Sequence, residues 1–519
     1  MEFIYAKGTQ LFCGDSPILL RGFGLGGWLL PEGYMWKLYT KCDRPRRMEE
    51  MIMTLCGQSY SEYFWDTYYD YYITESDIEW IAEKGFNSVR IPINARKLYH
   101  NTENGLTFDK ATINRLDRLI QWCSKSNIYV ILDMHGAPGG QTGANIDDSE
   151  SDLPELFMNN ENAQILIELW RMLADRYKNE PAIAGYDLLN EPLPNWFSQF
   201  NDKLMPLYME IIDAIRTVDS KHLIILEGLH WSTDFSIFES IPDNHYMKGI
   251  ILEFHKYWSN PDEDSLKPFI DASKRLNFPL FMGEGGENNK EWYTTMFPLY
   301  ERLGISWSFW SYKKMECNNS PITFDKPQKW NLVVGWLDRE NKLDTNEAKE
   351  VFDEFLYNIK HSTFNDDVIC ALDRRVPVLI PAEAYDAYEI YSERIEGASL
   401  RLSDPVSILF ESGKTGEVDY KRYGGESQPE AENLVVLLNC SDSVSYNFKS
   451  DFDRIISKIH CDGDGILKIK IQNRIYSKRV FGAKTFSLEF DLSPYMDGTI
   501  KISCTFGSVK LDTIQLNNI

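Results

Sequence analysis

Polar and aromatic residues close six of the short apolar segments in the first 310 residues of the chain. Two of them are glutamates, Glu191 and Glu284. A protonated carboxyl group can protonate the leaving oxygen of a glycosidic bond while an ionised carboxylate attacks the anomeric carbon. The other residues in these positions are Arg90, Asp133, His135, Asn190, His255, Tyr257 and Trp310. One such residue is typical of a helix cap or a salt bridge, whereas a set at corresponding positions indicates a common site.

The neighbours of the two glutamates are expected to divide the chemistry between them. An ionised partner raises the pKa of the acid, and nearby cations hold the pKa of the nucleophile down. Arg90 and His135 are the candidates for this tuning, Asn190 for a hydrogen bond to a sugar 2-hydroxyl, and Trp310 for an apolar face under the ring. The alternative is a buried salt-bridge network below the rim.

The elements that position these residues are short continuous apolar segments that alternate with amphipathic ones. Such segments are typical of strands buried on both faces. The eight apolar segments are 18–23, 88–92, 128–133, 183–189, 222–227, 249–254, 278–283 and 305–310, and the helical patterns between them include 76–84, 111–125, 162–177, 203–218 and 290–303. Ser76 and Glu79 have the spacing of a capping box. This alternation predicts an α/β fold, a (β/α)8 TIM barrel, in which functional side chains lie at the carboxyl ends of the strands. A doubly wound open sheet is the alternative, although no GxGxxG follows the first strand.

The pattern changes after a last helical segment at 346–360. Alternating apolar and polar residues at 398–402, 444–448, 467–471, 486–490 and 499–503 are separated by Gly, Asp, Asn and Ser. This alternation predicts a C-terminal antiparallel β-sandwich. We therefore expect a catalytic barrel over 1–362 and a β-sandwich over 363–519.

Composition narrows the class of partner. The formal net charge of −24 disfavours nucleic acid and anionic membrane and favours a neutral ligand. The nine cysteines contain no CxxC pair, so neither a zinc site nor a disulfide framework is expected. No run of 18 apolar residues and no signal-peptide pattern is present, so a cytoplasmic protein is expected, or a secreted one if a signal was removed. No catalytic cofactor is expected.

Several motifs resemble glycoside hydrolase family 5, and in particular its exo-β-1,3-glucanase-like branch. They are Arg21–Trp28, Val89–Pro92, Asp133–Gln141, Leu188–Pro192, His255–Tyr257 and Gly283–Gly285. By this resemblance Glu191 is the acid/base and Glu284 the nucleophile. It also implies that Arg90, His135, Asn190, His255, Tyr257 and Trp310 bind substrate and that Glu32 contacts a terminal sugar.

Three features depart from the pattern of that branch. Gly24 stands where asparagine is usual, Gly285 and Gly286 follow the nucleophile, and the segment 145–152 is unusually acidic. These positions concern subsites beyond the scissile bond. They leave the chemistry intact and the substrate open.

The C-terminal region resembles family 6 and family 35 carbohydrate-binding modules at 380–386 and 509–516. That resemblance implies a structural calcium ion near Glu383 and Asp512. In the barrel no His, Cys and Asp cluster has the spacing of metal ligands, so no metal is expected there. The alternative is a sandwich that binds neither sugar nor metal.

The sequence thus predicts a retaining β-glycosidase of the exo-β-glucosidase or exo-β-1,3-glucanase type, acting on a β-linked glucoside or oligosaccharide. Long loops at 25–39 and 136–153 are expected to close one end of the cleft, where Glu32, Asp147 and Asp148 would bind a terminal sugar. A mobile loop would instead leave the cleft open. The same residues are also compatible with an endo-β-1,4-glucanase, a β-mannanase, a glucolipid β-glucosidase, or a non-catalytic sugar-binding protein.

Overall fold

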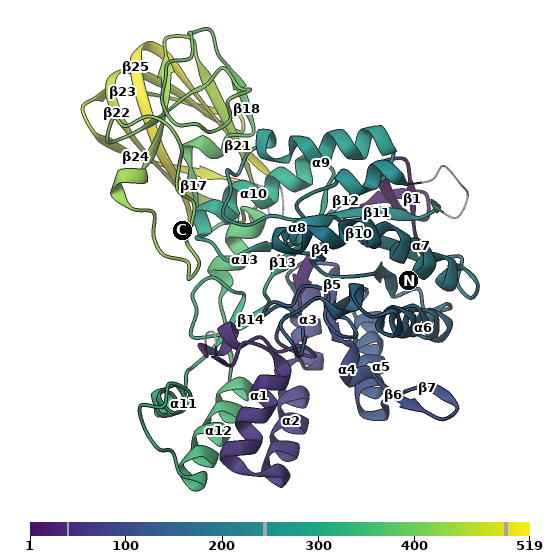
Figure 1. Ribbon diagram of the computed structural model, residues 1–519. Helices are drawn as coiled ribbons and strands as arrows, with labels where there is room; N and C mark the ends of the chain where they lie inside the picture. The colour runs from purple at the N-terminus through teal and green to yellow at the C-terminus, as the bar shows by residue number, and fades with distance from the viewer. Residues whose placement is uncertain (39–40, 242–246, 493–496) are drawn as a thin grey trace. The chain divides into compact units, whose positions relative to one another are not determined.

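Eight parallel strands form a closed barrel (Figure 1). The computed structural model describes residues 1–38, 41–241, 247–492 and 497–519. In barrel order the strands are β4 (Arg21–Gly24), β5 (Ser88–Asn94), β8 (Tyr129–Gly136), β9 (Ile183–Asp187), β10 (Leu223–Glu227), β11 (Ile250–His255), β12 (Leu280–Gly286) and β13 (Ser306–Trp310). Pairing of β13 with β4 closes the ring. Each strand overlaps one predicted apolar segment, so the predicted TIM barrel is confirmed.

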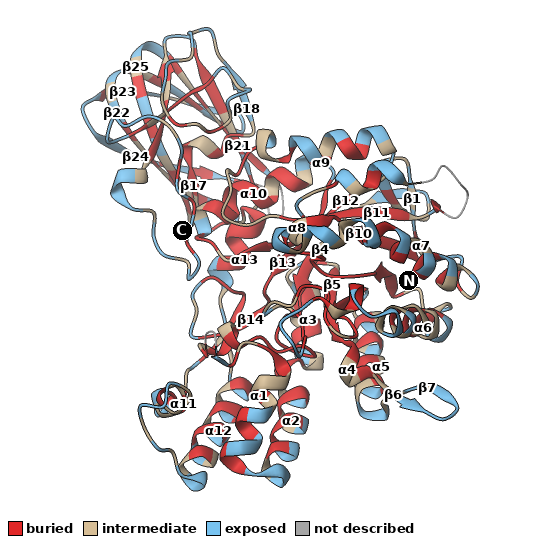
Figure 2. Ribbon diagram, in the orientation of Figure 1, coloured by how far each residue is buried: buried red, intermediate tan, exposed pale blue. Residues whose placement is uncertain are grey.

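The barrel strands are buried along their length, as the continuous apolar segments predicted (Figure 2). An N-terminal sheet of β1 (Ile4–Lys7), β2 (Gln10–Cys13) and β3 (Ser16–Ile18) contributes to the same core. Ile4 and Leu11 of this sheet cluster with barrel residues such as Ile225, Ile251 and Phe281. The opposite, carboxyl end of the strands is thereby left for polar side chains.

The predicted helices are present with small shifts at their ends. They are α3 (Glu75–Glu83), α5 (Lys110–Lys125), α6 (Asn160–Tyr177), α7 (Leu204–Arg216), α10 (Lys290–Arg302) and α12 (Thr345–Lys360); the sequence did not predict α9 (Glu263–Leu276). The expected capping box of Ser76 and Glu79 is wrong. Because α3 begins at Glu75, the box is formed by Thr74 and Asp77. None of the described helices is long and apolar enough to cross a membrane.

Many of the aromatic residues form a core beside α1 (Pro45–Cys56), α2 (Gln58–Tyr72), α11 (Trp330–Leu337) and α12. The ring of Phe355 lies 4.4 Å from that of Trp36 and 5.3 Å from that of Trp330, and Phe64 packs beside them. All four rings are buried. A large share of the aromatic content is therefore structural.

The C-terminal strands form one antiparallel nine-stranded sheet with the connectivity of a β-sandwich. The strands are β17 (Val378–Pro381), β18 (Ala387–Glu389), β19 (Ser407–Phe410), β20 (Leu434–Asn439), β21 (Ser443–Phe448), β22 (Arg454–Ile471), β23 (Arg474–Phe481), β24 (Lys484–Asp491) and β25 (Gly498–Asn518). β25 pairs with β22 along one edge and with β21, β20 and β17 in turn along the other. The predicted antiparallel sheet is confirmed.

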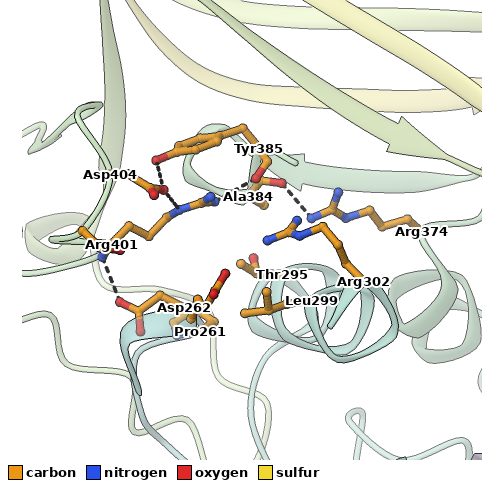
Figure 3. Close-up of a pocket in the computed structure, with 12 residues that line it drawn as sticks. Pro261, Asp262, Thr295, Leu299, Arg302, Arg374, Ala384, Tyr385, Arg401 and Asp404 are labelled. Carbon is orange, nitrogen blue, oxygen red and sulfur yellow. Dashed lines mark hydrogen bonds and ion pairs between the residues drawn. The ribbon is translucent and has the colours of Figure 1, made fainter. Parts of the chain in front are cut away.

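One predicted strand, at 398–402, is wrong. Ala398 forms only an isolated bridge with Gly416, and Arg401 adopts a left-handed backbone conformation. Figure 3 shows why this segment does not extend: the Arg401 guanidinium lies 3.5 Å from the ring centre of Tyr385 and pairs with Asp404 at 2.7 Å. A small cavity of about 30 Å³ lies at this cluster.

The chain divides into two compact units, which are described separately. The first contains 1–256, 269–285 and 304–364, and the second contains 257–268, 286–303 and 365–519. The second unit thus includes two short segments from the stretch that the sequence assigns to the barrel domain. The domain boundary at 362/363 stays a prediction.

Candidate active site

The guanidinium of Arg90, on β5, is completely buried and lies among five carboxyl groups. Its nitrogens lie 2.6 Å from Glu284, 2.7 Å from Asp187, 2.9 Å from Glu227, 3.1 Å from Asp133 and 3.4 Å from Glu253. It also donates to the amide oxygen of Asn190 at 2.8 Å. A guanidinium keeps its charge when buried, and its planar fork can bind several carboxylates at once. Arg90 therefore fixes the positions of six polar groups, which lie on five strands or just after them.

Asp187, Glu227 and Glu253 were not predicted from the sequence. They lie at or near the ends of β9, β10 and β11. The available signal was a charged residue inside a continuous apolar segment, where an unpaired charge is too costly to bury. Gly283 makes room for one of them, because a Cβ atom at that position would lie 1.4 Å from an oxygen of Glu253.

The structure brings Glu191 and Glu284 together. Both are buried, with exposed fractions of 8% and 4%. One carboxylate oxygen of Glu191, one of Glu284 and a ring nitrogen of His255 all lie within 4.8 Å of one another. A retaining pair of carboxyl groups is separated by about 5 to 5.5 Å and an inverting pair by about 6.5 to 9.5 Å. The retaining separation of about 5 to 5.5 Å stays a prediction, which the proximity of these two oxygens supports.

His255, at the end of β11, lies between these two glutamates. Its Nδ1 is 2.7 Å from Glu191 and 3.6 Å from Glu284, and its Nε2 is 3.2 Å from Glu253. Burial lowers the pKa of His255, but Glu227, Glu284 and Glu191 outweigh it and raise the pKa well above its ordinary value. An imidazolium is thus held where it donates from both ring nitrogens.

The electrostatics of Glu284 differ from the expectation that cations lower its pKa. Burial raises the pKa of Glu284 to about 7, although His255, Arg90 and His135 act in the opposite direction. Burial likewise raises the pKa of Asp133 to about 8 against the influence of Arg90. Desolvation of the carboxylates at the bottom of the site is therefore stronger than the sequence suggests.

His135, Asn190 and Trp310 form the next part of the site. The rings of His135 and Trp310 stack at 5.4 Å, and His135 Nδ1 lies 2.7 Å from Asp133. Burial lowers the pKa of His135 to about 4, so the ring is neutral, and in the tautomer protonated at Nδ1 this nitrogen donates a hydrogen bond to Asp133. The Asn190 amide nitrogen lies 3.4 Å from His135 Nε2. The departure at Gly24 is explained here, because a Cβ atom there would lie 2.6 Å from the Trp310 ring.

Gln141 is a further residue whose role was not predicted from the sequence. It is fully buried, and its amide donates to the backbone oxygens of His135 at 2.7 Å and Asn190 at 2.9 Å. Its position in the Asp133–Gln141 motif was the signal. Gln141 thus links the end of β8, which carries His135, to the loop after β9, which carries Asn190.

Glu32 and Tyr257 keep their predicted roles as predictions. Glu32 is buried beside the short helix at Gly33–Trp36. Tyr257 follows β11 by two residues, is half-buried, and belongs to the second unit. Its ring lies 5.2 Å from that of Trp258.

The expected sugar contacts of Asp147 and Asp148 are wrong. Asp147 accepts from the backbone nitrogens of Thr142 and Ser149 at 2.8 and 2.9 Å and from the Thr142 hydroxyl. Asp148 accepts from the Arg46 backbone and pairs with Arg96. These carboxylates are occupied in holding their own loop.

Three groups of buried residues in the barrel have the spacing of metal ligands, contrary to the expectation from the sequence. They are Asp133, His135 and Glu284; Glu191, His255 and Glu284; and Glu227, Glu253 and His255. Arg90 already lies within 3.4 Å of every Asp and Glu in these groups except Glu191, which His255 contacts. A second cation would face the charge of Arg90 or of the His255 imidazolium, so the donor sets do not fit a resident metal ion.

A family model, Cellulase (glycosyl hydrolase family 5), matches residues 50–316, just over half of the chain. A β-xylosidase from Phanerodontia chrysosporium is 31% identical over 46% of this chain and 48% of its own length. Endoglucanase C from Acetivibrio thermocellus is 26% identical over 48% and 86%. Glucan 1,3-beta-glucosidase 2 from Saccharomyces cerevisiae is 26% identical over 50% and 53%. The match thus spans about half the length of two of these relatives.

Among solved structures, that of an endogalactoceramidase covers 99% of this chain and 100% of its own, with a TM-score of 0.50 and 16% identity. This likeness extends over both units and concerns the fold alone.

The arrangement around Arg90 predicts a large stability cost for its removal. In Arg90→Met the ionised partners lose their counter-ion while staying buried, so the free energy of unfolding should fall by about 3 to 5 kcal/mol. Urea unfolding followed by circular dichroism measures it.

Arg118→Met is the matched control. Arg118 is exposed and pairs with exposed Asp70, so its loss should cost less than about 1 kcal/mol. Equal, small losses in the two variants would contradict the assignment of Arg90 as the counter-ion of the site.

Proposed function

The chain belongs to glycosyl hydrolase family 5, and on this premise we propose that it is a retaining β-glucosidase that removes the terminal glucose of its substrate. The observation that carries this proposal is the pair of buried carboxylates, Glu191 and Glu284, bridged by His255. Membership of a hydrolase family also argues against a non-catalytic sugar-binding protein.

In the proposed mechanism Glu284 attacks the anomeric carbon and forms the covalent glycosyl-enzyme. Arg90, 2.6 Å from Glu284, orients the attacking carboxylate and stabilises its ionised form. Glu191 protonates the leaving oxygen and then removes a proton from the water that hydrolyses the intermediate. Asn190, oriented by Arg90, is positioned for the 2-hydroxyl of the sugar.

The exo mode is supported by a rigid wall between the loops that follow β4 and β8. The buried Arg44 side chain donates to the oxygen and hydroxyl of Ser149 at 3.1 and 2.6 Å and pairs with Asp152 at 2.8 Å. Asp148 ties the same loop to Arg46. A loop with this many contacts is held in place, which supports a closed terminal subsite near Glu32 over the alternative of a mobile loop and an open cleft.

Endo-β-1,4-glucanase, β-mannanase and glucolipid β-glucosidase activities are the competing candidates. The relatives are an endoglucanase, a glucan 1,3-β-glucosidase and a β-xylosidase, so similarity alone does not choose a sugar or a mode of attack. A β-linked glucoside or oligosaccharide is the proposed substrate, and the nine free cysteines support a reducing, cytoplasmic location.

For the second unit we propose a carbohydrate-binding-module-like role with a structural calcium ion near Glu383 and Asp512. Burial raises the pKa of Glu383 to about 7, and repulsion from Asp512 and Glu291 adds to it. Both proposed ligands line a cavity of about 300 Å³ within this unit. Oxygen ligands of this kind suit calcium, which would relieve the repulsion.

Replacement of the proposed nucleophile tests the mechanism first. Glu284→Ala should reduce turnover of an aryl β-glucoside by about a thousandfold or more, since no glycosyl-enzyme can form. Azide should restore activity and give the inverted glycosyl azide. The control Glu79→Ala, on an exposed face of α3, should behave as the unmodified protein. Near-normal activity in Glu284→Ala would refute the assignment.

Replacement of the proposed acid should separate substrates by leaving group. Glu191→Ala should slow glucosides with poor leaving groups by about 10² to 10⁴-fold and activated aryl glucosides much less, because only the former need a proton. Steady-state kinetics on a series of aglycones measures this dependence. Equal losses on all substrates would mean that Glu191 has only a structural role.

Product analysis decides the mode of attack. If the Arg44 wall closes the cleft, laminari-oligosaccharides or cello-oligosaccharides should release glucose as the sole early product. Early appearance of a spread of longer oligosaccharides would show an open cleft and an endo mode.

Metal chelation separates the two units. EDTA should leave turnover unchanged, because the barrel donors are occupied by Arg90 and His255, whereas calcium should raise the thermal stability of the second unit. Asp512→Asn should abolish this calcium effect. Loss of turnover in EDTA with the fold intact would contradict the first expectation, and a thermal stability that calcium does not raise would contradict the second.

A further inference from the structure

The charge of the chain is not evenly distributed. Residues 454–519, which contain β22 to β25, carry ten lysine and arginine residues against six aspartate and glutamate residues. The chain as a whole has a formal net charge of −24. The repulsion of anionic surfaces that the net charge predicts therefore does not extend to these four strands.

Register places several of these basic side chains on one face. Along β22 the even-numbered residues from 464 to 470 point outward while the odd-numbered ones are buried. Lys468 and Lys470 lie on this outward face, and Arg479 of β23 is opposite Ile466 on the same face. Lys468, Lys470 and Arg479 form no ion pair among residues 1–38, 41–241, 247–492 and 497–519. Asp464 is the acidic residue on this part of β22, and Lys501 of β25 pairs with Glu389.

The same face carries large exposed apolar side chains. Phe481 is 70% exposed, Phe506 64% and Ile475 58%. Phe481 is opposite Asp464, Ile475 is opposite Lys470, and Phe506 is opposite Ile466 across the other edge of β22. The apolar and basic residues are therefore neighbours on three adjacent strands, β23, β22 and β25, whose exposed residues Figure 2 shows in pale blue.

We propose that this face of β22, β23 and β25 binds the surface of an anionic lipid bilayer, with Phe481 and Phe506 inserted between headgroups and Lys468, Lys470 and Arg479 against lipid phosphates and carboxylates. Insertion of exposed aromatic rings into the bilayer–water interface lowers the free energy, and each basic side chain near an anionic leaflet strengthens binding further. A neutral sugar would not neutralise the unpaired basic side chains. A second copy of this acidic chain would supply negative charge but no apolar layer for the exposed rings. The proposal is independent of the proposed glycosidase activity.

Vesicle co-sedimentation of the full chain tests the proposal. Binding to phosphatidylcholine vesicles containing about one third phosphatidylserine should exceed binding to pure phosphatidylcholine vesicles, and salt at about 0.5 M should weaken it. The triple variant Lys468→Glu, Lys470→Glu, Arg479→Glu should lower the partition coefficient by about 100-fold or more. Phe481→Ser with Phe506→Ser should lower it at high salt as well.

Matched variants control for overall charge and hydrophobicity. Lys110→Glu, Lys342→Glu, Lys360→Glu changes the net charge equally at exposed positions of the first unit, and Tyr63→Ser with Leu402→Ser removes exposed apolar groups elsewhere. Both should bind vesicles as the unmodified chain does, and circular dichroism should show all variants folded. Equal binding to the two kinds of vesicle would overturn the proposal, and so would equal losses in the test and control variants. It would also be overturned if the unmodified chain were a dimer that does not bind vesicles and the Phe481 and Phe506 variant were a monomer.

Discussion

The contact of the Arg90 guanidinium with five buried carboxyl groups is the interaction on which the catalytic half of the molecule depends. One guanidinium cannot neutralise five carboxylates in a medium of low polarity, so some of these groups must keep a proton. Burial raises the pKa of Asp187 and Glu253 well above the ordinary range, and that of Asp133 to about 8. Each of these three also has an oxygen without a hydrogen-bond partner among the described residues. With Asp133, Asp187 and Glu253 protonated, the positive charge of Arg90 is balanced by Glu284 and Glu227.

Glu227 connects this buried layer with the proposed acid/base. Burial alone would raise the pKa of Glu227, but His255, Arg90 and the Glu191 backbone N–H together lower it. The hydrogen bond from the Glu191 backbone nitrogen to the Glu227 carboxylate, 2.7 Å between N and O, holds Glu191 in a left-handed backbone conformation with φ of 44°. Such a conformation costs about 1 to 3 kcal/mol in a residue other than glycine and persists only where its surroundings impose it. The ion network thus determines where the Glu191 carboxyl group points.

Both compact units contain more acidic than basic residues, but charged side chains have different surroundings in the two. In the first unit, many acidic side chains form internal contacts: Asp147 and Asp148 hold a loop in place, and the acidic residues of the barrel surround Arg90. In the second, the sheet of β22 to β25 presents unpaired basic side chains beside exposed rings. A chain with a strongly negative total charge can therefore offer a positive surface, because local fields are screened beyond about 10 Å.

The sequence by itself determined the barrel, most helix positions and the strand ends that carry Glu191 and Glu284. Continuous apolar segments and period-2 alternation depend on local burial, which the order of residues records directly. The sequence did not reveal that Asp187, Glu227 and Glu253 meet at Arg90, because that meeting requires β9, β10 and β11 to close into one ring with β5. It also assigned Asp147 and Asp148 to a terminal sugar, because the backbone amides and arginines that occupy these carboxylates come together only in the folded loop. The pKa of Glu284 was decided by tertiary structure for the same reason: desolvation depends on what surrounds a carboxylate in space, and the chain order contains no direct record of it.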